Sequence, residues 1–358
     1  MGENLALALF GALPVAGFGA FIFYLRKLRR AGRKTTLGQV VWGNLMLATA
    51  AVGCALFLGE FYYRFIYDTT DSLNCTKVSE RWFRRYFHQN AGGWRDTIPY
   101  SLPLTKGTRR ITFFGDSFTA GHGIKALTNT FPLIIRRSHP EWEIHVLAQP
   151  GFDTQNELYV INKILPAGYQ LDVVVLVYCL NDIMDLVPEN EAAINRVYHN
   201  LDSSGWLRQN SYLFNILGTK FVVMNDPYFK NYFDHLREAY EHSLWEQQQT
   251  RLTEFAELVR TNQGRLVVVT FPFLNKLGNE YEFSDIHAKL NEFWKKRQVP
   301  TLDLLSVFQS EKPAEVTVNR QDSHPNERGQ ALAAEAITRF LQNQISTEAI
   351  PREESNPQ

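Results

Sequence analysis

The stretch Arg109–Gly121, RRITFFGDSFTAG, decides the fold class of this chain. Its first part, residues 109–114, is a short apolar run typical of a β-strand. Ser117 follows directly, at the start of a helix pattern, where open α/β sheets bind ligands and a helix offers free backbone N–H groups to an anion. The Gly-Asp-Ser sequence alone is weak evidence, because Asp116 and Ser117 are also ordinary helix-capping residues.

Similar apolar runs recur along the chain and alternate with helical patterns. Several, such as LDVVVLVYC at 171–179, are continuous Val and Leu runs of the kind found in parallel strands covered on both faces. The pattern therefore predicts βαβ units and a parallel five-stranded sheet. Strands are expected at 109–114, 143–148, 171–179, 265–271 and 299–304, and helices at 130–138, 154–165, 243–262, 284–297 and 327–343.

Three segments fall outside this alternation. The interval 182–263 is too long for a simple crossover, so we expect a helical insertion at about 183–262 in an α/β domain that spans 109–345. Residues 68–108 show no clean periodicity and are interpreted as a connecting region. The polar tail 346–358 is expected to be disordered.

Residues 1–67 have a different composition and predict a membrane hairpin. Two apolar stretches, at about 5–25 and 37–61, are each long enough to cross a bilayer. The loop between them, 26–36, contains six cations: Arg26, Lys27, Arg29, Arg30, Arg33 and Lys34. Positive loops stay in the cytoplasm, so the chain after Tyr67 is predicted to face the periplasm or cell exterior, from an inner or plasma membrane.

Two other interpretations of the N-terminus are possible. The first is a single span followed by an interfacial segment. The second is a cleaved signal peptide, although the initial MGEN lacks the positive region that precedes the apolar core of such peptides.

Charge and cysteine content exclude some classes of function. The chain has 37 Lys and Arg against 37 Asp and Glu, a balance that gives no indication of nucleic-acid binding. No CxxC motif and no Cys/His cluster with zinc spacing is present, and neither a metal nor a cofactor is expected. Cys75 and Cys179 could pair, but Cys179 ends an apolar strand and is expected to be buried and free.

Four short motifs lie at or near the predicted carboxyl ends of strands or before the last helix. Since the carboxyl ends of parallel strands meet at one edge of a sheet, these motifs are expected to converge. They are Gly115-Asp116-Ser117, Gln149-Pro150-Gly151-Phe152-Asp153, Tyr178-Cys179-Leu180-Asn181-Asp182 and Asp322-Ser323-His324-Pro325-Asn326.

The residue types in these motifs fit nucleophilic catalysis of acyl transfer. A serine hydroxyl needs a base to attack near neutral pH, and His324 is the candidate base for Ser117. The oxyanion of the tetrahedral intermediate needs donors, for which we predict the backbone N–H groups of Ser117 and Gly151 and the side chain of Asn181. Loss of one such donor costs on the order of 3 kcal/mol.

The ordered set of motifs resembles the SGNH (GDSL) hydrolase superfamily over about residues 109–340. The resemblance implies a three-layer, flavodoxin-like fold. It also implies that Ser117 is the nucleophile and first oxyanion donor, that Gly151 and Asn181 are further donors, and that His324 is the base.

One motif departs from the superfamily pattern, which places an aspartate three residues before the histidine. Here Gln321 occupies that position and Asp322 stands two residues before His324. Asp322 is predicted to orient the imidazole and complete a triad. The alternative is a Ser-His dyad in which a backbone carbonyl orients the ring.

Three further features near the four motifs are expected to have mainly structural roles. Asp182 is expected to cap a turn, and His122 to line the pocket mouth or lie on the surface. The stretch Gly93–Asp96 resembles one found in some membrane-associated SGNH proteins of polysaccharide O-acetylation. It either faces the substrate or packs against the core.

The sequence thus predicts a membrane-anchored serine esterase that acts on an acyl or acetyl ester of a lipid or glycan. The alternative from the same chemistry is an O-acyltransferase that modifies a cell-surface polysaccharide. Two spans are too few to carry an acyl group across a membrane, so a transferase would need a membrane acyl-donor partner. A non-catalytic surface module is the third possibility.

Overall fold

The computed structural model describes residues 2–32, 34–278 and 280–346. Two compact units can be distinguished by their packing. The first contains the chain up to Trp82 together with Ala193–Lys230, and the second contains Phe83–Ala192 together with the chain from Asn231 onward. The predicted disordered tail falls, from residue 347, outside the described residues.

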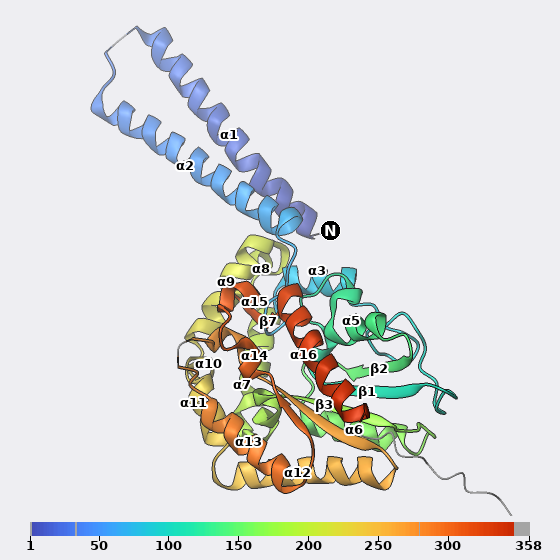
Figure 1. Cartoon of the computed structure of the whole chain (residues 1–358). Helices are drawn as coiled ribbons and strands as arrows, with labels where there is room; N and C mark the ends of the chain where they lie inside the picture. Colours follow the sequence, from blue (N-terminus) through green and yellow to red (C-terminus); the bar gives the residue numbers. More distant parts are fainter. Residues whose placement is uncertain (1, 33, 279, 347–358) are drawn as a thin grey trace, which may run out of the picture. The chain divides into compact units, whose positions relative to one another are not determined.

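The second unit is built on a five-stranded parallel sheet with strand order β2-β1-β3-β4-β5 (Figure 1). This arrangement confirms the predicted parallel sheet and its flavodoxin-like order. The strands are β1 (Arg109–Gly115), β2 (Trp142–Ala148), β3 (Val173–Cys179), β4 (Arg265–Phe271) and β5 (Thr301–Asp303).

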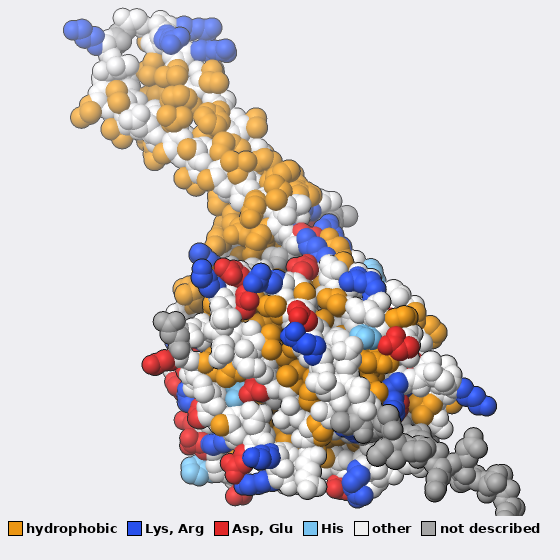
Figure 2. All heavy atoms as spheres, viewed as in Figure 1, with side chains coloured by type: hydrophobic (Ala, Val, Ile, Leu, Met, Phe, Trp, Pro, Cys, Tyr) orange, Lys and Arg blue, Asp and Glu red, His pale blue; other side chains and the backbone are white. Residues whose placement is uncertain are grey.

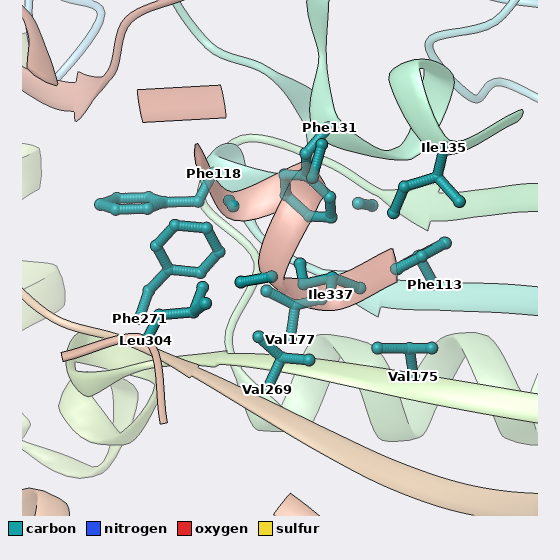
Figure 3. Close-up of a cluster of buried hydrophobic side chains, with 14 of the residues drawn as sticks. Phe113, Phe118, Phe131, Ile135, Val175, Val177, Val269, Phe271, Leu304 and Ile337 are labelled. Atoms are coloured by element: carbon teal, nitrogen blue, oxygen red, sulfur yellow. The ribbon is translucent and has the colours of Figure 1, made fainter. Parts of the chain in front are cut away.

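Helices cover both faces of this sheet because neighbouring strand residues point to opposite sides. Phe113 of β1 contacts Phe131 of α5 (Phe131–Ser138), which packs beside α16 (Glu327–Ser346). Figure 3 shows this side of the core, with Phe113, Phe131 and Ile337 turned toward one another. The next residue, Phe114, contacts Phe255 of α12 (His242–Thr261) on the other face. The sheet is thus the middle of three layers.

Further helices and two short strands complete the second unit. A two-stranded antiparallel sheet, β6 with β7, was not predicted. The further elements of the second unit are α4 (Ser117–Ala120), η2 (Leu127–Asn129), α6 (Thr154–Ile164), η3 (Leu180–Leu186), α11 (Tyr232–Ala239), η4 (Leu274–Lys276), α13 (Ser284–Lys296), α14 (Leu305–Phe308), α15 (Pro313–Val316), β6 (Thr317–Asn319) and β7 (Asp322–Pro325).

The interval 182–263 is helical among its described residues, and it contributes to both units. Its middle, Ala193–Lys230, packs with the N-terminal helices, a division that periodicity alone did not indicate. It contains most of α7 (Pro188–Asp202), with α8 (Trp206–Asn210), α9 (Tyr212–Asn225) and α10 (Pro227–Lys230). The region 68–108 contains one helix, α3 (Lys77–Tyr86), where the sequence pattern predicted none.

The N-terminal hairpin consists of α1 (Gly2–Ala31) and α2 (Leu37–Phe61), which continues as the π-helical turn η1 (Tyr62–Ile66). Both helices are long and apolar enough to cross a membrane. Small residues let them approach closely, since a Cβ on Gly17 would lie 2.9 Å from the Ala50 Cβ. Figure 2 shows hydrophobic side chains along the hairpin and Lys and Arg side chains at its loop end.

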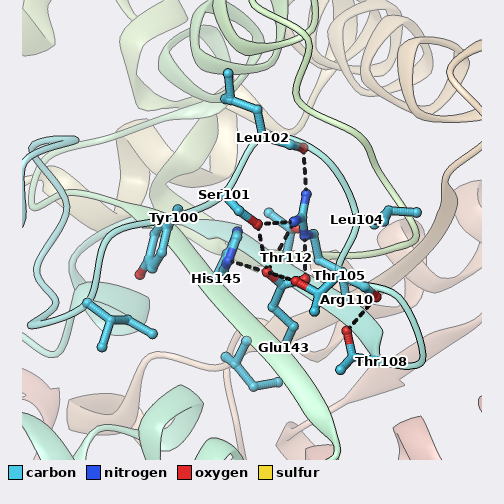
Figure 4. A network of polar contacts seen from close by, with 12 residues as sticks. Tyr100, Ser101, Leu102, Leu104, Thr105, Thr108, Arg110, Thr112, Glu143 and His145 are labelled. Atoms are coloured by element: carbon cyan, nitrogen blue, oxygen red, sulfur yellow. Dashed lines mark hydrogen bonds and ion pairs between the residues drawn. The ribbon is translucent and has the colours of Figure 1, made fainter.

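A buried arginine organises the opposite end of the sheet from the sequence motifs. Arg110 of β1 is fully buried and donates to Glu143 of β2 at 3.0 and 3.1 Å, and to the backbone carbonyls of Leu102 and Gln170 (Figure 4). The Glu143 carboxylate also lies 3.3 Å from the His145 ring. The guanidinium charge is therefore paired and its donors are used, which a buried charge requires.

His145 is a buried imidazole at this end of the sheet. Its ring is 2% exposed, stacks on Tyr100 and bonds the Tyr169 hydroxyl at 2.8 Å. Burial, assisted by the nearby Arg110 charge, lowers the pKa of His145 to about 4.

We predict that the free energy of unfolding falls as the pH drops from about 6.5 to 4, because the unfolded chain binds a proton that the folded site resists. The loss amounts to about 3 kcal/mol at most. Denaturant titrations of the full-length protein across this range measure it. A His145→Asn variant should lose this part of the pH slope, and an unchanged slope would contradict the assignment.

Candidate active site

Ser117 begins the short helix α4 at the carboxyl end of the central region of the sheet. Asp116 is the N-cap residue, and its Oδ1 accepts a bond from the Phe118 backbone N–H at 2.9 Å. The preceding Gly115 is required by crowding, since a Cβ there would lie 2.3 Å from the Thr119 hydroxyl. The turn thus fixes the serine at the end of β1. Asp116 acts there as a helix cap, which its residue type had indicated.

His324 reaches Ser117 from β7, 207 residues further along the chain. Its Nε2 lies 2.7 Å from the Ser117 Oγ, and its Nδ1 lies 2.5 Å from the Asp322 Oδ1. Since a carboxylate only accepts, Nδ1 carries the proton and Nε2 of the neutral ring accepts from the serine hydroxyl. All three side chains are at least nine-tenths buried. They form a continuous relay from carboxylate to imidazole to hydroxyl.

The close spacing of Asp322 and His324 has a simple structural reason. Both residues belong to β7, and side chains two positions apart in a strand lie on the same face. The Asp322 Oδ1 also accepts the His324 backbone N–H at 3.1 Å. An aspartate two residues before the histidine can therefore make the contact predicted for it, and the structure favours a triad geometry over the dyad alternative.

A second imidazole, that of His122, shares the same carboxylate. His122 stacks on His324 with ring centroids 4.0 Å apart and an interplanar angle of 12°, and its Nε2 lies 3.4 Å from the Asp322 Oδ2. The ring is 2% exposed, so the expectation of a surface or pocket-mouth residue was wrong. The backbone explains its position: the His122 N–H donates to the Ser117 carbonyl, where α4 ends.

The two imidazoles determine the charge of Asp322. Burial alone would raise the pKa of this carboxyl, but attraction to His324 and His122 and their hydrogen bonds outweigh burial and hold the pKa well below its usual range. Asp322 is consequently a carboxylate at any pH where the protein is expected to work. A fixed negative charge beside His324 stabilises the imidazolium that forms when the ring takes a proton.

Asp116 lies further from the serine hydroxyl than His324 does. Its Oδ2 lies 3.3 Å from the Ser117 Oγ, further than the 2.7 Å to the imidazole. Burial raises the pKa of Asp116. Glu157 and Asp182 lie in the same buried region, where burial and repulsion from the Asp116 carboxylate raise their pKa values well above the usual range. Asp182 caps its turn, as expected, by accepting a hydrogen bond from the Cys179 backbone N–H at 2.8 Å.

The predicted oxyanion donors follow the two strands that flank β1. Gly151 comes three residues after β2, and Asn181 comes two residues after β3. Because β2, β1 and β3 are neighbouring parallel strands, their carboxyl ends lie along one edge, beside Ser117. Gly151 has φ +82°, a conformation that glycine adopts without strain. Their role as oxyanion donors stays a prediction.

The Gly93–Asp96 stretch contributes mainly structure. Arg95 is buried and donates to the carbonyls of Ala120, Gly121 and Ile124, so it holds the turn that follows the serine helix. Asp96 is paired with Arg136 at 2.5 Å. Trp94 differs, since it is only partly buried and meets Phe152, the neighbour of Gly151, edge to face. Trp94 is the one side chain of this stretch that is not buried, since Arg95 and Asp96 are both enclosed.

The ligand atoms of His122, Asp322 and His324 lie within 4.8 Å of one another, close enough to hold a metal ion. In the described part of the chain this is the only such group. Both ring nitrogens of His324 are already hydrogen-bonded, to Ser117 and Asp322, so the arrangement suits proton transfer. The thiols of Cys75 and Cys179 are both free, as expected for Cys179.

The family is established by sequence comparison. The model of the GDSL-like Lipase/Acylhydrolase family matches residues 113–332, so the chain belongs to this family and is an ester-hydrolysing enzyme. The match runs from β1 through the start of α16 and includes Ser117 and His324. No curated protein matches the chain.

Solved structures with a similar fold include members of the same family. A lipolytic G-D-S-L protein from Veillonella parvula is 14% identical over 66% of this chain and 99% of its own, with a TM-score of 0.42. A putative acylhydrolase from Bacteroides fragilis is 16% identical over 68% and 92%, also at 0.42. A variant of an acetyl xylan esterase from Geobacillus stearothermophilus is 12% identical over 66% and 95%, at 0.42.

The role of Asp322 can be tested against its neighbour in the same strand. Asp322→Asn should lower kcat for ester hydrolysis by roughly 10³–10⁴-fold with little change in KM, because the imidazole loses its orienting charge. Ser323→Ala is the matched control, since Ser323 points to the opposite face of β7, and it should keep most of the activity. Equal activity of the Asp322→Asn variant and the wild type would favour the dyad.

Proposed function

We propose that this protein is a membrane-anchored serine esterase whose catalytic unit faces the extracytoplasmic side of an inner or plasma membrane. The observation that carries the proposal is the relay of Ser117, His324 and Asp322, with contacts of 2.7 and 2.5 Å in a buried setting. The substrate is an acyl or acetyl ester of a lipid or glycan.

In the proposed reaction, the Ser117 Oγ attacks the ester carbonyl carbon as His324 Nε2 takes the hydroxyl proton. The resulting oxyanion is held by the N–H groups of Ser117 and Gly151 and the amide of Asn181. His324 then returns the proton to the alcohol oxygen as the carbon–oxygen bond breaks, which leaves an acyl-serine. Water, deprotonated by His324, attacks this intermediate and releases the acid and free Ser117.

The charge state of Asp322 supports this sequence of steps. Since its pKa is held well below the usual range, the carboxylate is present when His324 becomes an imidazolium. The ring of His122 stacks on His324 at 4.0 Å and lies 3.4 Å from the second carboxylate oxygen, so it braces both groups.

The N-terminal hairpin supports the membrane location. Two helices, Gly2–Ala31 and Leu37–Ile66, have the length and hydropathy of membrane spans. The cations between them favour a cytoplasmic loop, which supports an extracytoplasmic location for the residues after Tyr67. An anchored catalytic unit meets esters that are held at or near the membrane surface, which is why lipid and cell-surface glycan esters are proposed.

Substitution of the nucleophile and the base tests the function. Ser117→Ala and His324→Ala, each in the full-length protein in detergent, should lower hydrolysis of short-chain, long-chain and sugar acetate esters by roughly 10³–10⁶-fold. Ser138→Ala, an exposed serine of α5, is the matched control and should retain full activity. Thermal unfolding checks that each variant is folded.

The proposal would be overturned by Ser117→Ala protein that still hydrolyses every ester accepted by the wild type. Product analysis in the presence of a sugar acceptor distinguishes ester hydrolysis from acyl transfer at this site. Free acid as the product supports the esterase, whereas an acylated sugar formed in its place would reassign the enzyme as a transferase.

A further inference from the structure

We propose that the insertion helices α8 and α9 carry a second membrane contact, a face that lies on the extracytoplasmic surface of the lipid bilayer. This outer apolar face consists of Trp206, Leu207, Leu217, Phe221 and Met224, which are 39–70% exposed. The inference rests on the membrane anchoring proposed above and adds to it a role for residues far outside the two spans.

Helix α9 is apolar on both its inner and its outer side. On the inner side, Tyr212 and Ile216 are buried in a cluster with Val78. On the outer side, Phe221 is 70% exposed and Met224 is 61% exposed. A helix that is apolar all round is normally enclosed on all sides. The outer face of α9 therefore needs a cover that the described residues of this unit do not provide.

The start of α9 is attached to the hairpin end opposite the cationic loop. Glu60, buried at the end of α2, accepts bonds from the Ser211 hydroxyl at 2.6 Å and from the backbone N–H groups of Tyr212 and Leu213 at 3.1 and 3.0 Å. Its charge is thus placed at the N-terminus of α9, which stabilises that helix. This also explains why a glutamate ends the second apolar stretch.

A contact between α9 and α1 indicates how deep in the bilayer the start of α9 lies. Phe214 stacks on Phe10 of α1, with ring centroids 5.8 Å apart. A span of about 20 residues crosses the hydrocarbon region, so counting back from Leu25, next to the cations, places Phe10 inside the bilayer. Phe214 then lies at the edge of the hydrocarbon region. Leu217 and Phe221 follow one and two turns later, only about 5 and 11 Å further along α9.

The composition of the segment suits a lipid surface. Residues 206–225 contain no Asp or Glu, whereas they contain the cations Arg208 and Lys220. Lys220 is exposed beside the outer apolar face, where its chain can extend to lipid phosphates. The exposed Trp206 has the amphipathic ring that is enriched at membrane interfaces.

Continuity with the spans favours lipid over a protein as the cover. The surfaces of α1 and α2 are dominated by exposed apolar side chains, which Figure 2 shows along the hairpin. A bilayer that surrounds these helices also contacts the segment that is hydrogen-bonded to their extracytoplasmic end. The outer apolar face is in this position, because its helix begins at the Glu60 contact.

Spin labels on the full-length protein in liposomes that contain anionic lipid test this contact. The partly buried Cys54 and Cys75 are first replaced (Cys54→Ala, Cys75→Ser), and the fully buried Cys179 is kept. Single cysteines are then introduced by Phe221→Cys in the outer apolar face, Val52→Cys in α2 and Glu257→Cys in α12. Accessibility to oxygen, which dissolves in lipid, is compared with accessibility to a water-soluble nickel complex.

The label at 221 should resemble the label at 52, with a ratio of oxygen to nickel accessibility several-fold above that of the aqueous label at 257. A lipid-like label at 52 with an aqueous label at 221 overturns the inference and leaves the anchor intact. Low accessibility of the label at 221 to both reagents also overturns it, because a second copy or another protein would then cover the face. An aqueous label at 52 overturns the anchor and this inference together.

Discussion

The hydrogen bond between Ser117 Oγ and His324 Nε2 is the interaction on which the catalytic unit depends. It joins two positions 207 residues apart, so it exists only if β1, the helical layers and the β6–β7 hairpin are all in place. The sheet order puts β1 between β2 and β3, which brings the serine turn and the candidate oxyanion donors to one edge. Arg110 secures the opposite end of the same strand.

The extended conformation of β7 gives this site its particular form. It allows an aspartate two residues before His324 to reach the imidazole, and it leaves the second carboxylate oxygen of Asp322 to His122. One carboxylate thus faces two stacked imidazoles. A buried carboxylate is costly unless its oxygens are hydrogen-bonded, and here each Asp322 oxygen lies beside one of the two imidazoles.

Much of this arrangement could be predicted from the sequence, because it depends on local patterns. The strand patterns gave the parallel sheet, and the motif order identified Ser117 and His324, which the structure brings together. Other features depend on tertiary packing. Helix α3 was missed because its many cations hide the apolar pair Val78 and Trp82, and no periodicity indicates that His122 turns inward. The attachment of residues 193–230 to the hairpin rests on Glu60, which resembles a simple break in an apolar run.

Covalent labelling by a fluorophosphonate tests the central claim most directly, because this reagent reacts with a serine only where a base activates the hydroxyl. On the full-length protein we predict one adduct, mapped by peptide mass spectrometry to Ser117. The adduct should be lost in Ser117→Ala protein and form far more slowly in His324→Ala protein. An adduct on another serine, or no adduct on protein that hydrolyses esters, would contradict the account.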